Sequence, residues 1–274
     1  MSTPQLRVER RSQSTGRLDG RVVLVTGGAR GIGKAIALET GLAGAAVAIV
    51  GRDVASLNDS AYQLRQFGIE CTPIRCDVTD EASVEACGNV VERRYGRIDG
   101  VVANAGLPGP TIPLHKLELA DWRFCLTSNL DSVFLTFRRF IPQMISAGSG
   151  NLVALSSMTG KRPLHGRTPY AAAKMGVIGL VRTLAAELGD FGIRVNCLCP
   201  GAVDGDRIRK VILAQAEARG ITTDEARESL VKGSPMSRFV TEAEVAKSCL
   251  FLLTDLSSGI TGEDLNVSAG TVMY

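Results

Sequence analysis

The sequence predicts a single α/β domain built on a doubly wound, seven-stranded parallel sheet flanked by helices. Short β-branched runs alternate with longer helical patterns along the chain. The short runs lack the polar alternation of a half-exposed strand, which is typical of strands covered on both faces. A length of 274 residues suits one large domain.

The elements are expected in strand and helix pairs, with strands marked by β-branched runs and helices by apolar periodicity. The expected strands are Val22–Thr26, Val47–Val50, Cys71–Arg75, Ile98–Asn104, Asn151–Ser156, Val195–Cys199 and Leu265–Val267. The expected helices are Gly31–Ala43, Ala55–Phe67, Glu81–Tyr95, one long helix from Ala120 to about Ala147, Pro169–Leu188, Asp206–Ala218, Thr223–Val231 and Glu242–Thr254. Ligands of such sheets bind beyond the carboxyl ends of the strands.

Composition excludes several classes of function. Lys and Arg total 31 against 28 for Asp and Glu, so the basic field typical of nucleic-acid binding is missing. The seven cysteines form no C-x-x-C pair and only two histidines are present, so we expect reduced, buried thiols and no metal site. No stretch reaches the roughly 18 apolar residues of a membrane span.

Residues 1–19 are rich in Arg and Ser and contain no apolar segment. They are interpreted as a flexible tail, with a mitochondrial presequence as a minor alternative that Glu9 and Asp19 disfavour. The sequence therefore predicts a cytoplasmic protein.

A glycine-rich loop, Thr26-Gly-Gly-Ala-Arg-Gly-Ile-Gly33, links the first strand to an apolar helix. Glycines there allow a tight turn and let backbone amides and the helix N-terminus approach a pyrophosphate. The spacing is Gly-x-x-x-Gly-x-Gly rather than G-x-G-x-x-G, so a plain glycine turn is the alternative.

These residues carry a resemblance to the classical short-chain dehydrogenase/reductase family, in particular to members like 3-oxoacyl-[acyl-carrier-protein] reductase. It runs from about Leu18 to the end of the chain and implies a Rossmann-type catalytic domain over residues 20–274. The family's glycine loop, its Asp-Val pair and its Asn-Ala-Gly are matched here, although Ala103 replaces the Asn that usually precedes the last motif. The positions expected to contact the cofactor are Gly27, Arg30, Gly31, Ile32, Gly33, Arg52, Asp77, Val78, Asn104, Ala105, Gly106, Tyr170, Lys174, Pro200, Gly201 and Val203.

Cofactor choice is predicted from the end of the second strand. An acidic residue there would bond the ribose 2′-hydroxyl of NAD, whereas an Arg would pair with the 2′-phosphate of NADP. Gly51 occupies the acidic position, Arg52 follows it, and Arg30 lies in the glycine loop. We therefore expect NADP(H), with NAD(H) as the alternative, and assign Asp53 to capping the next helix.

Tyr170 and Lys174 are four residues apart on an expected helix, so a phenol and an ammonium share one face. The resemblance implies that Tyr170 is the general acid/base, that Lys174 lowers its pKa and holds the nicotinamide ribose, and that Ser157 polarises the substrate carbonyl. It also implies that Asn129 sustains a proton relay through water. The family's cofactor-contacting Thr after Pro200-Gly201 is absent, and Gly205 stands in that region.

The predicted function is that of an NADP(H)-dependent oxidoreductase interconverting a secondary alcohol and a ketone, or an alcohol and an aldehyde. An NAD-dependent dehydrogenase of a polyol, sugar or hydroxy acid is the alternative, and a non-catalytic nucleotide-binding regulator is a third interpretation. The resemblance further implies a substrate-covering lobe at about 202–239 and a homotetramer formed through the two long helices. The loop 161–167 carries Lys161, Arg162, His165 and Arg167 but no acid, which suggests an anionic small-molecule substrate; ordinary surface charge is the alternative.

Overall fold

The structure, a computed structural model, describes residues 16–274. Most of the expected tail, residues 1–15, lies outside the described residues. Within the remainder, Leu18 is buried and its N–H donates to the carbonyl of Ala43 at 2.8 Å. The chain is therefore packed against the domain before the first strand begins.

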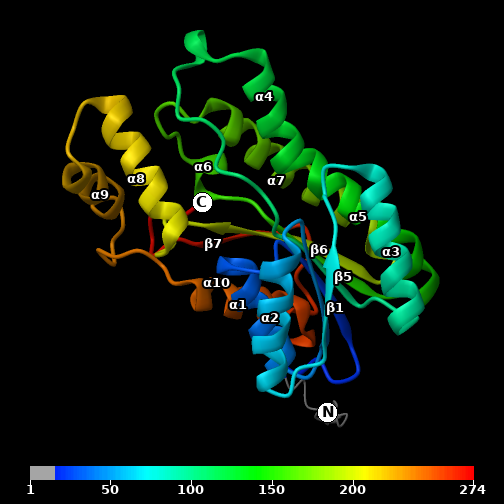
Figure 1. Cartoon of the computed structure of the whole chain (residues 1–274). Coiled ribbons are helices and arrows are strands. Elements are labelled where there is room, and N and C mark those ends of the chain that lie inside the picture. Colours follow the sequence, from blue (N-terminus) through cyan, green and yellow to red (C-terminus); the bar gives the residue numbers. More distant parts are fainter. Residues whose placement is uncertain (1–15) are drawn as a thin grey trace, which may run out of the picture.

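Seven parallel strands form one sheet in the order β3-β2-β1-β4-β5-β6-β7 (Figure 1). They are β1 (Val22–Thr26), β2 (Ala46–Gly51), β3 (Cys71–Arg75), β4 (Gly100–Ala103), β5 (Gly150–Leu155), β6 (Ile193–Pro200) and β7 (Asp264–Val267). The strand order reverses between β1 and β4, where a doubly wound sheet opens a crevice for ligands. The predicted fold class is confirmed.

The helices cover both faces of this sheet (Figure 1). They are α1 (Gly31–Leu42), α2 (Val54–Gln66), α3 (Glu81–Tyr95), α4 (Leu119–Leu126), α5 (Ser132–Ala147), α6 (Met158–Lys161), α7 (Thr168–Leu188), α8 (Asp206–Arg219), α9 (Thr223–Val231) and α10 (Glu242–Leu253). Side chains of α3, α5 and α7 pack on one face, and those of α1, α2 and α10 on the other.

Alternation along the strands explains why their sequences read as continuous apolar runs. In β1, Val22 and Leu24 join the core under α3, α5 and α7, whereas Val23 and Val25 join the core under α1, α2 and α10. Both faces are thus removed from water, and a polar residue on either would lose solvation.

The helical stretch expected from Ala120 to about Ala147 is continuous over residues 119–147, but it is not α-helical throughout. The structure has α4, a π-helical turn at Thr127–Asp131, and then α5. A π turn changes the hydrogen-bond spacing without changing the apolar pattern, and such turns occur frequently at functional sites. Asn129 lies within it.

Beyond the carboxyl edge of the sheet, α8 and α9 form a separate small layer (Figure 1). Ile212 and Ala216 of α8 pack with Ala226 and Leu230 of α9 in a core of their own, which Met158 of α6 also joins. Gln215 Nε2 donates to the carbonyl of His165 at 2.9 Å and so ties this layer to the loop before α7. Among residues 16–274, no helix combines the length and apolar content required to cross a bilayer.

Candidate active site

The glycine loop at the end of β1 is packed too tightly for side chains. A Cβ on Gly33 would lie 2.2 Å from the carbonyl oxygen of Gly27, and Gly27 and Gly31 have φ of +65° and +58°. Thr26 Oγ1 accepts hydrogen bonds from the N–H groups of Asn104 and Ala105, both at 3.0 Å. The loops after β1 and β4 are therefore joined, and no side chain caps the N-terminus of α1.

Charged side chains gather at the ends of β2 and β3. Arg52 Nη1 lies 3.8 Å from Asp77 Oδ2, and the Arg52 side chain is 64% exposed. A hydrogen bond from the Thr79 side chain lowers the pKa of Asp77 despite partial burial. Asp53 caps α2 as expected, by accepting from the N–H groups of Ala55 and Ser56.

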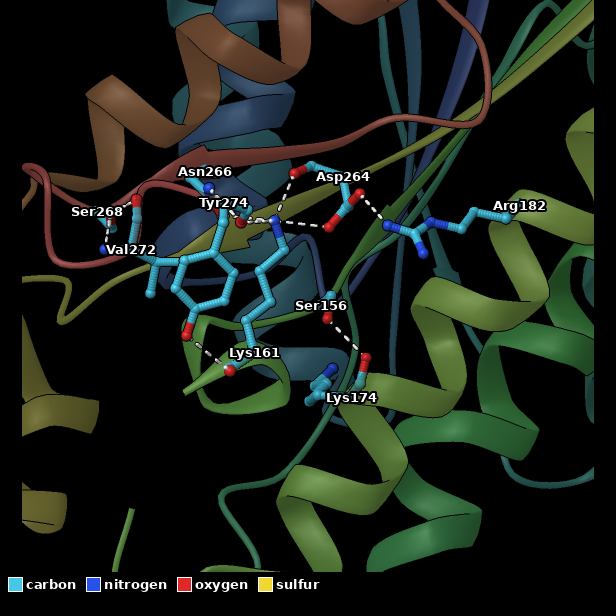
Figure 2. Close-up of polar contacts among 9 residues, drawn as sticks. All are labelled: Ser156, Lys161, Lys174, Arg182, Asp264, Asn266, Ser268, Val272 and Tyr274. Atoms are coloured by element: carbon cyan, nitrogen blue, oxygen red, sulfur yellow. Dashed lines mark hydrogen bonds and ion pairs between the residues drawn. The ribbon is translucent and has the colours of Figure 1, made fainter. Parts of the chain in front are cut away.

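Tyr170 and Lys174 both lie on buried positions of α7, with the Lys174 Nζ 5.7 Å from the centre of the tyrosine ring. Lys174 Nζ donates to the carbonyl of Leu155 at 2.7 Å, which anchors the ammonium to the end of β5. Ser157 is the N-cap of α6, and its Oγ accepts from the N–H of Thr159 at 3.1 Å. Ser156 points elsewhere: its Oγ donates to the carbonyl of Lys174 at 2.7 Å (Figure 2).

Asn129 is fully buried in the π-helical turn. Its Nδ2 donates to the carbonyl of Cys125 at 2.9 Å, while its Oδ1 has no hydrogen-bond partner among the described residues. A Cβ on Gly106 would lie 2.7 Å from this Oδ1 and 3.6 Å from Lys174 Nζ. Gly106 therefore lets the amide and the ammonium approach the loop after β4.

The segment after β6 completes the edge of the site. Gly201 donates its N–H to Val267 O at 2.9 Å, and a Cβ on Gly201 would lie 2.8 Å from Ser268 Cα. Val203 forms a short bridge with Val240. The structure thus brings the expected positions Pro200, Gly201 and Val203 to the sheet edge, next to the loop that leads into α8.

Comparison with known proteins matches this architecture along almost the whole chain. The sequence model of a family described as enoyl-(acyl carrier protein) reductase matches residues 27–272. The 3-oxoacyl-[acyl-carrier-protein] reductase FabG of Thermotoga maritima is 34% identical over 259 residues, covering 94% of this chain and 100% of that protein. The chain belongs to the short-chain dehydrogenase/reductase family.

Solved structures agree with this assignment. NAD⁺-bound xylitol dehydrogenase superposes with a TM-score of 0.90 at 30% identity, covering 92% of this chain and 99% of that one. A variant of actinorhodin polyketide ketoreductase with NADPH gives 0.89 at 32% identity, covering 93% and 98%. The sequence-based family prediction is confirmed, and this short-chain dehydrogenase/reductase is an oxidoreductase whose relatives bind one or the other nicotinamide cofactor.

Sequence reasoning misread two basic residues of this short-chain dehydrogenase/reductase as parts of an open cationic loop. The Lys161 side chain is only 7% exposed and is held by Asp264, by Asn266 Oδ1 and by the main-chain oxygen of Tyr274 (Figure 2). Arg167 is 4% exposed. Both residues are therefore held by contacts within the chain, Lys161 with the segment around β7 and Arg167 with the loop after β4.

A carboxyl group beside the glycine loop was also missed. Glu242 Oε1 lies 3.4 Å from the position of a Cβ on Gly31 and 3.2 Å from one on Gly205. Burial raises the pKa of Glu242, and the nearby Asp206 and Asp204 act in the same direction. The sequence signal was weak because an acid in the first turn of a helix is ordinarily a helix-stabilising residue.

Proposed function

We propose that this short-chain dehydrogenase/reductase uses NADP(H) to interconvert a secondary alcohol and a ketone, with Tyr170 as the proton-transferring group. The observation that carries the proposal is the convergence of Asn129, Tyr170 and Lys174 around Gly106 and the end of β5. Ser157 follows that strand directly.

The loop residues fit a dinucleotide. Glycines at positions 27, 31 and 33 allow a tight turn against the loop after β4, and no side chain caps the N–H groups at the start of α1, which would bind a pyrophosphate. When bound, the nicotinamide supplies or accepts the hydride. Asp77 and Arg52 are placed to contact the adenosine end.

The remaining steps belong to the protein. Ser157 Oγ already accepts from Thr159, so its own hydrogen is left to donate to a substrate carbonyl oxygen. Tyr170 gives its proton to the forming alkoxide in reduction and receives it in oxidation. The Lys174 charge favours the phenolate, and Asn129 Oδ1 is placed to hold a water that returns the proton.

The cofactor assignment rests on the chemistry of Arg52. Its guanidinium is exposed at the end of β2, with no acidic residue at Gly51 to bind a ribose hydroxyl. NAD-linked oxidation of a polyol is the second candidate, favoured by the similarity to NAD⁺-bound xylitol dehydrogenase.

Titration of nicotinamide fluorescence with NADPH and NADH distinguishes the two. We expect the wild-type protein to bind NADPH more tightly than NADH. The Arg52→Ala substitution should weaken the binding of NADPH roughly tenfold or more and leave the binding of NADH unchanged. Arg93→Ala, a change at an exposed position near the end of α3, is the matched control. Preference for NADH would reverse the cofactor assignment, and binding of neither would favour a non-catalytic protein.

We also propose a homotetramer assembled through the outer surfaces of α4, α5 and α7. Phe124, Phe134 and Met175 are exposed there, and an interface over these helices would remove all three side chains from water. Light scattering coupled to gel filtration measures the mass, and a monomer would contradict this assembly.

A further inference from the structure

Arg167 lies against the ring of Tyr170. Its Cζ is 4.7 Å from the ring centre, closer than the 5.7 Å of Lys174 Nζ. Arg167 is also the N-cap residue of α7, three positions before the tyrosine. A guanidinium over an aromatic face is attracted by the ring, and the attraction grows when the ring carries negative charge.

The same guanidinium holds the loop between β4 and α4. Arg167 Nη2 donates to the carbonyl of Pro108, and Nη1 donates to Thr111 Oγ1 at 3.4 Å. Next to it, the N–H of Ile112 donates to the carbonyl of Gly166 at 2.9 Å. These contacts fasten the 108–112 segment to the start of α7, above the tyrosine ring.

We propose that Arg167 is a positioning residue for Tyr170, which fixes the ring beneath the 108–112 loop and adds a second positive charge beside the phenol. This inference rests on the proposed role of Tyr170 in proton transfer. An arginine is suited to the task because its planar fork can stack on a ring and donate to two acceptors at once.

The charges around the phenol support this role. Lys174 lies on the same helix as Tyr170, and Arg167 is the N-cap residue of that helix. Cys125 lies on α4, and its Sγ is 2.6 Å from the position of a Cβ on Gly109. Burial raises the pKa of Cys125 even though both cations oppose it, so the thiol is neutral. The loop from Asn104 to Pro113 contains no charged residue. Arg167 and Lys174 thus both hold a positive charge within 5.7 Å of the ring centre.

Absorbance at the tyrosinate band tests the inference without needing a substrate. Subtracting the pH titration of Tyr170→Phe from that of wild type isolates ionisation of this one phenol. The same subtraction is made in the Arg167→Gln, Arg167→Lys and Arg93→Gln backgrounds. Arg167→Met is a second neutral variant in case the Gln variant folds poorly, and thermal melting checks folding in each.

We expect Arg167→Gln to move the midpoint upward by on the order of one pH unit, because removing a cation disfavours the phenolate. Arg167→Lys should restore only part of the shift, because lysine returns the charge without the planar fork, and Arg93→Gln should match wild type. Equal midpoints in wild type and Arg167→Gln would overturn the inference. Retained turnover of ethyl acetoacetate by Tyr170→Phe would instead overturn the proposed function and leave the titration interpretable.

Discussion

Replacing Gly33 by Ala should weaken cofactor binding and stability together. The added Cβ would lie 2.2 Å from Gly27 O and 2.5 Å from Asn104 Nδ2, whereas real Cβ contacts stay above 3.0 Å. The first of these atoms belongs to the backbone, so the glycine loop must move by most of an ångström. Overpacking of this kind costs about 1–3 kcal/mol, and the better helix propensity of Ala returns up to about 1 kcal/mol.

The net loss of about 1–2 kcal/mol corresponds to a decrease in Tm of roughly 2–4 °C for a chain of this size. Displacement of the loop should also weaken the binding of NADPH or NADH at least about tenfold, as measured by fluorescence titration. Gly189→Ala is the matched control, because Gly189 also has helical backbone angles and nothing lies within 4 Å of its added Cβ. Wild-type Tm and wild-type cofactor affinity in Gly33→Ala would refute the reasoning.

Two further predictions concern buried and capping charges. Lys161→Met should lower the free energy of unfolding by about 2 kcal/mol near neutral pH, since it removes the closest cation of a carboxylate that is 11% exposed. Burial opposes ionisation of that carboxylate, Asp264, but hydrogen bonds from Lys161 and Arg182 lower its pKa. The loss of unfolding free energy, measured by denaturant unfolding, should therefore be full above the unfolded pKa of about 4. It should shrink as pH falls through the lower pKa of the folded state. A loss that is the same at all pH values would count against this pairing. The Arg238 side chain and the capping box at Thr241 lower the pKa of Glu244 to about 2. Its stabilisation is therefore fully present above the unfolded value of about 4.3 and is lost as pH falls through the folded value of about 2, so calorimetry should find the Tm deficit of Glu244→Gln narrowing from about pH 5 to about pH 2.

The layout of the fold could be predicted because local signals agree with the tertiary structure. β1, β3 and α3 have the predicted bounds. Asp80 caps the start of α3, and Gly96 ends it in the left-handed conformation. Pro73 is compatible with the predicted strand because β3 lies at the edge of the sheet, where a residue without an N–H group is tolerated.

The rest of the site depends on contacts that no local pattern encodes. The π-helical turn at Asn129 leaves the apolar periodicity of its neighbours unchanged. Lys161 and Arg167 were expected in a cationic loop beside the substrate, with ordinary surface charge as the alternative, yet their partners lie 103 residues later and 59 residues earlier in the chain. The short helix α6 has only four residues, too few for a periodic signal.

The strand order also determines how the protein is assembled during synthesis. The first three strands extend the sheet in one direction from β1, and each strand from β4 onward joins the opposite, growing edge as it leaves the ribosome. The residues that surround Tyr170 are all synthesised before β7, but Asp264, which holds Lys161 at the end of α6, belongs to the last strand. Lys161 at the end of α6 therefore gains its carboxylate partner only after β7 has been synthesised and has paired with β6.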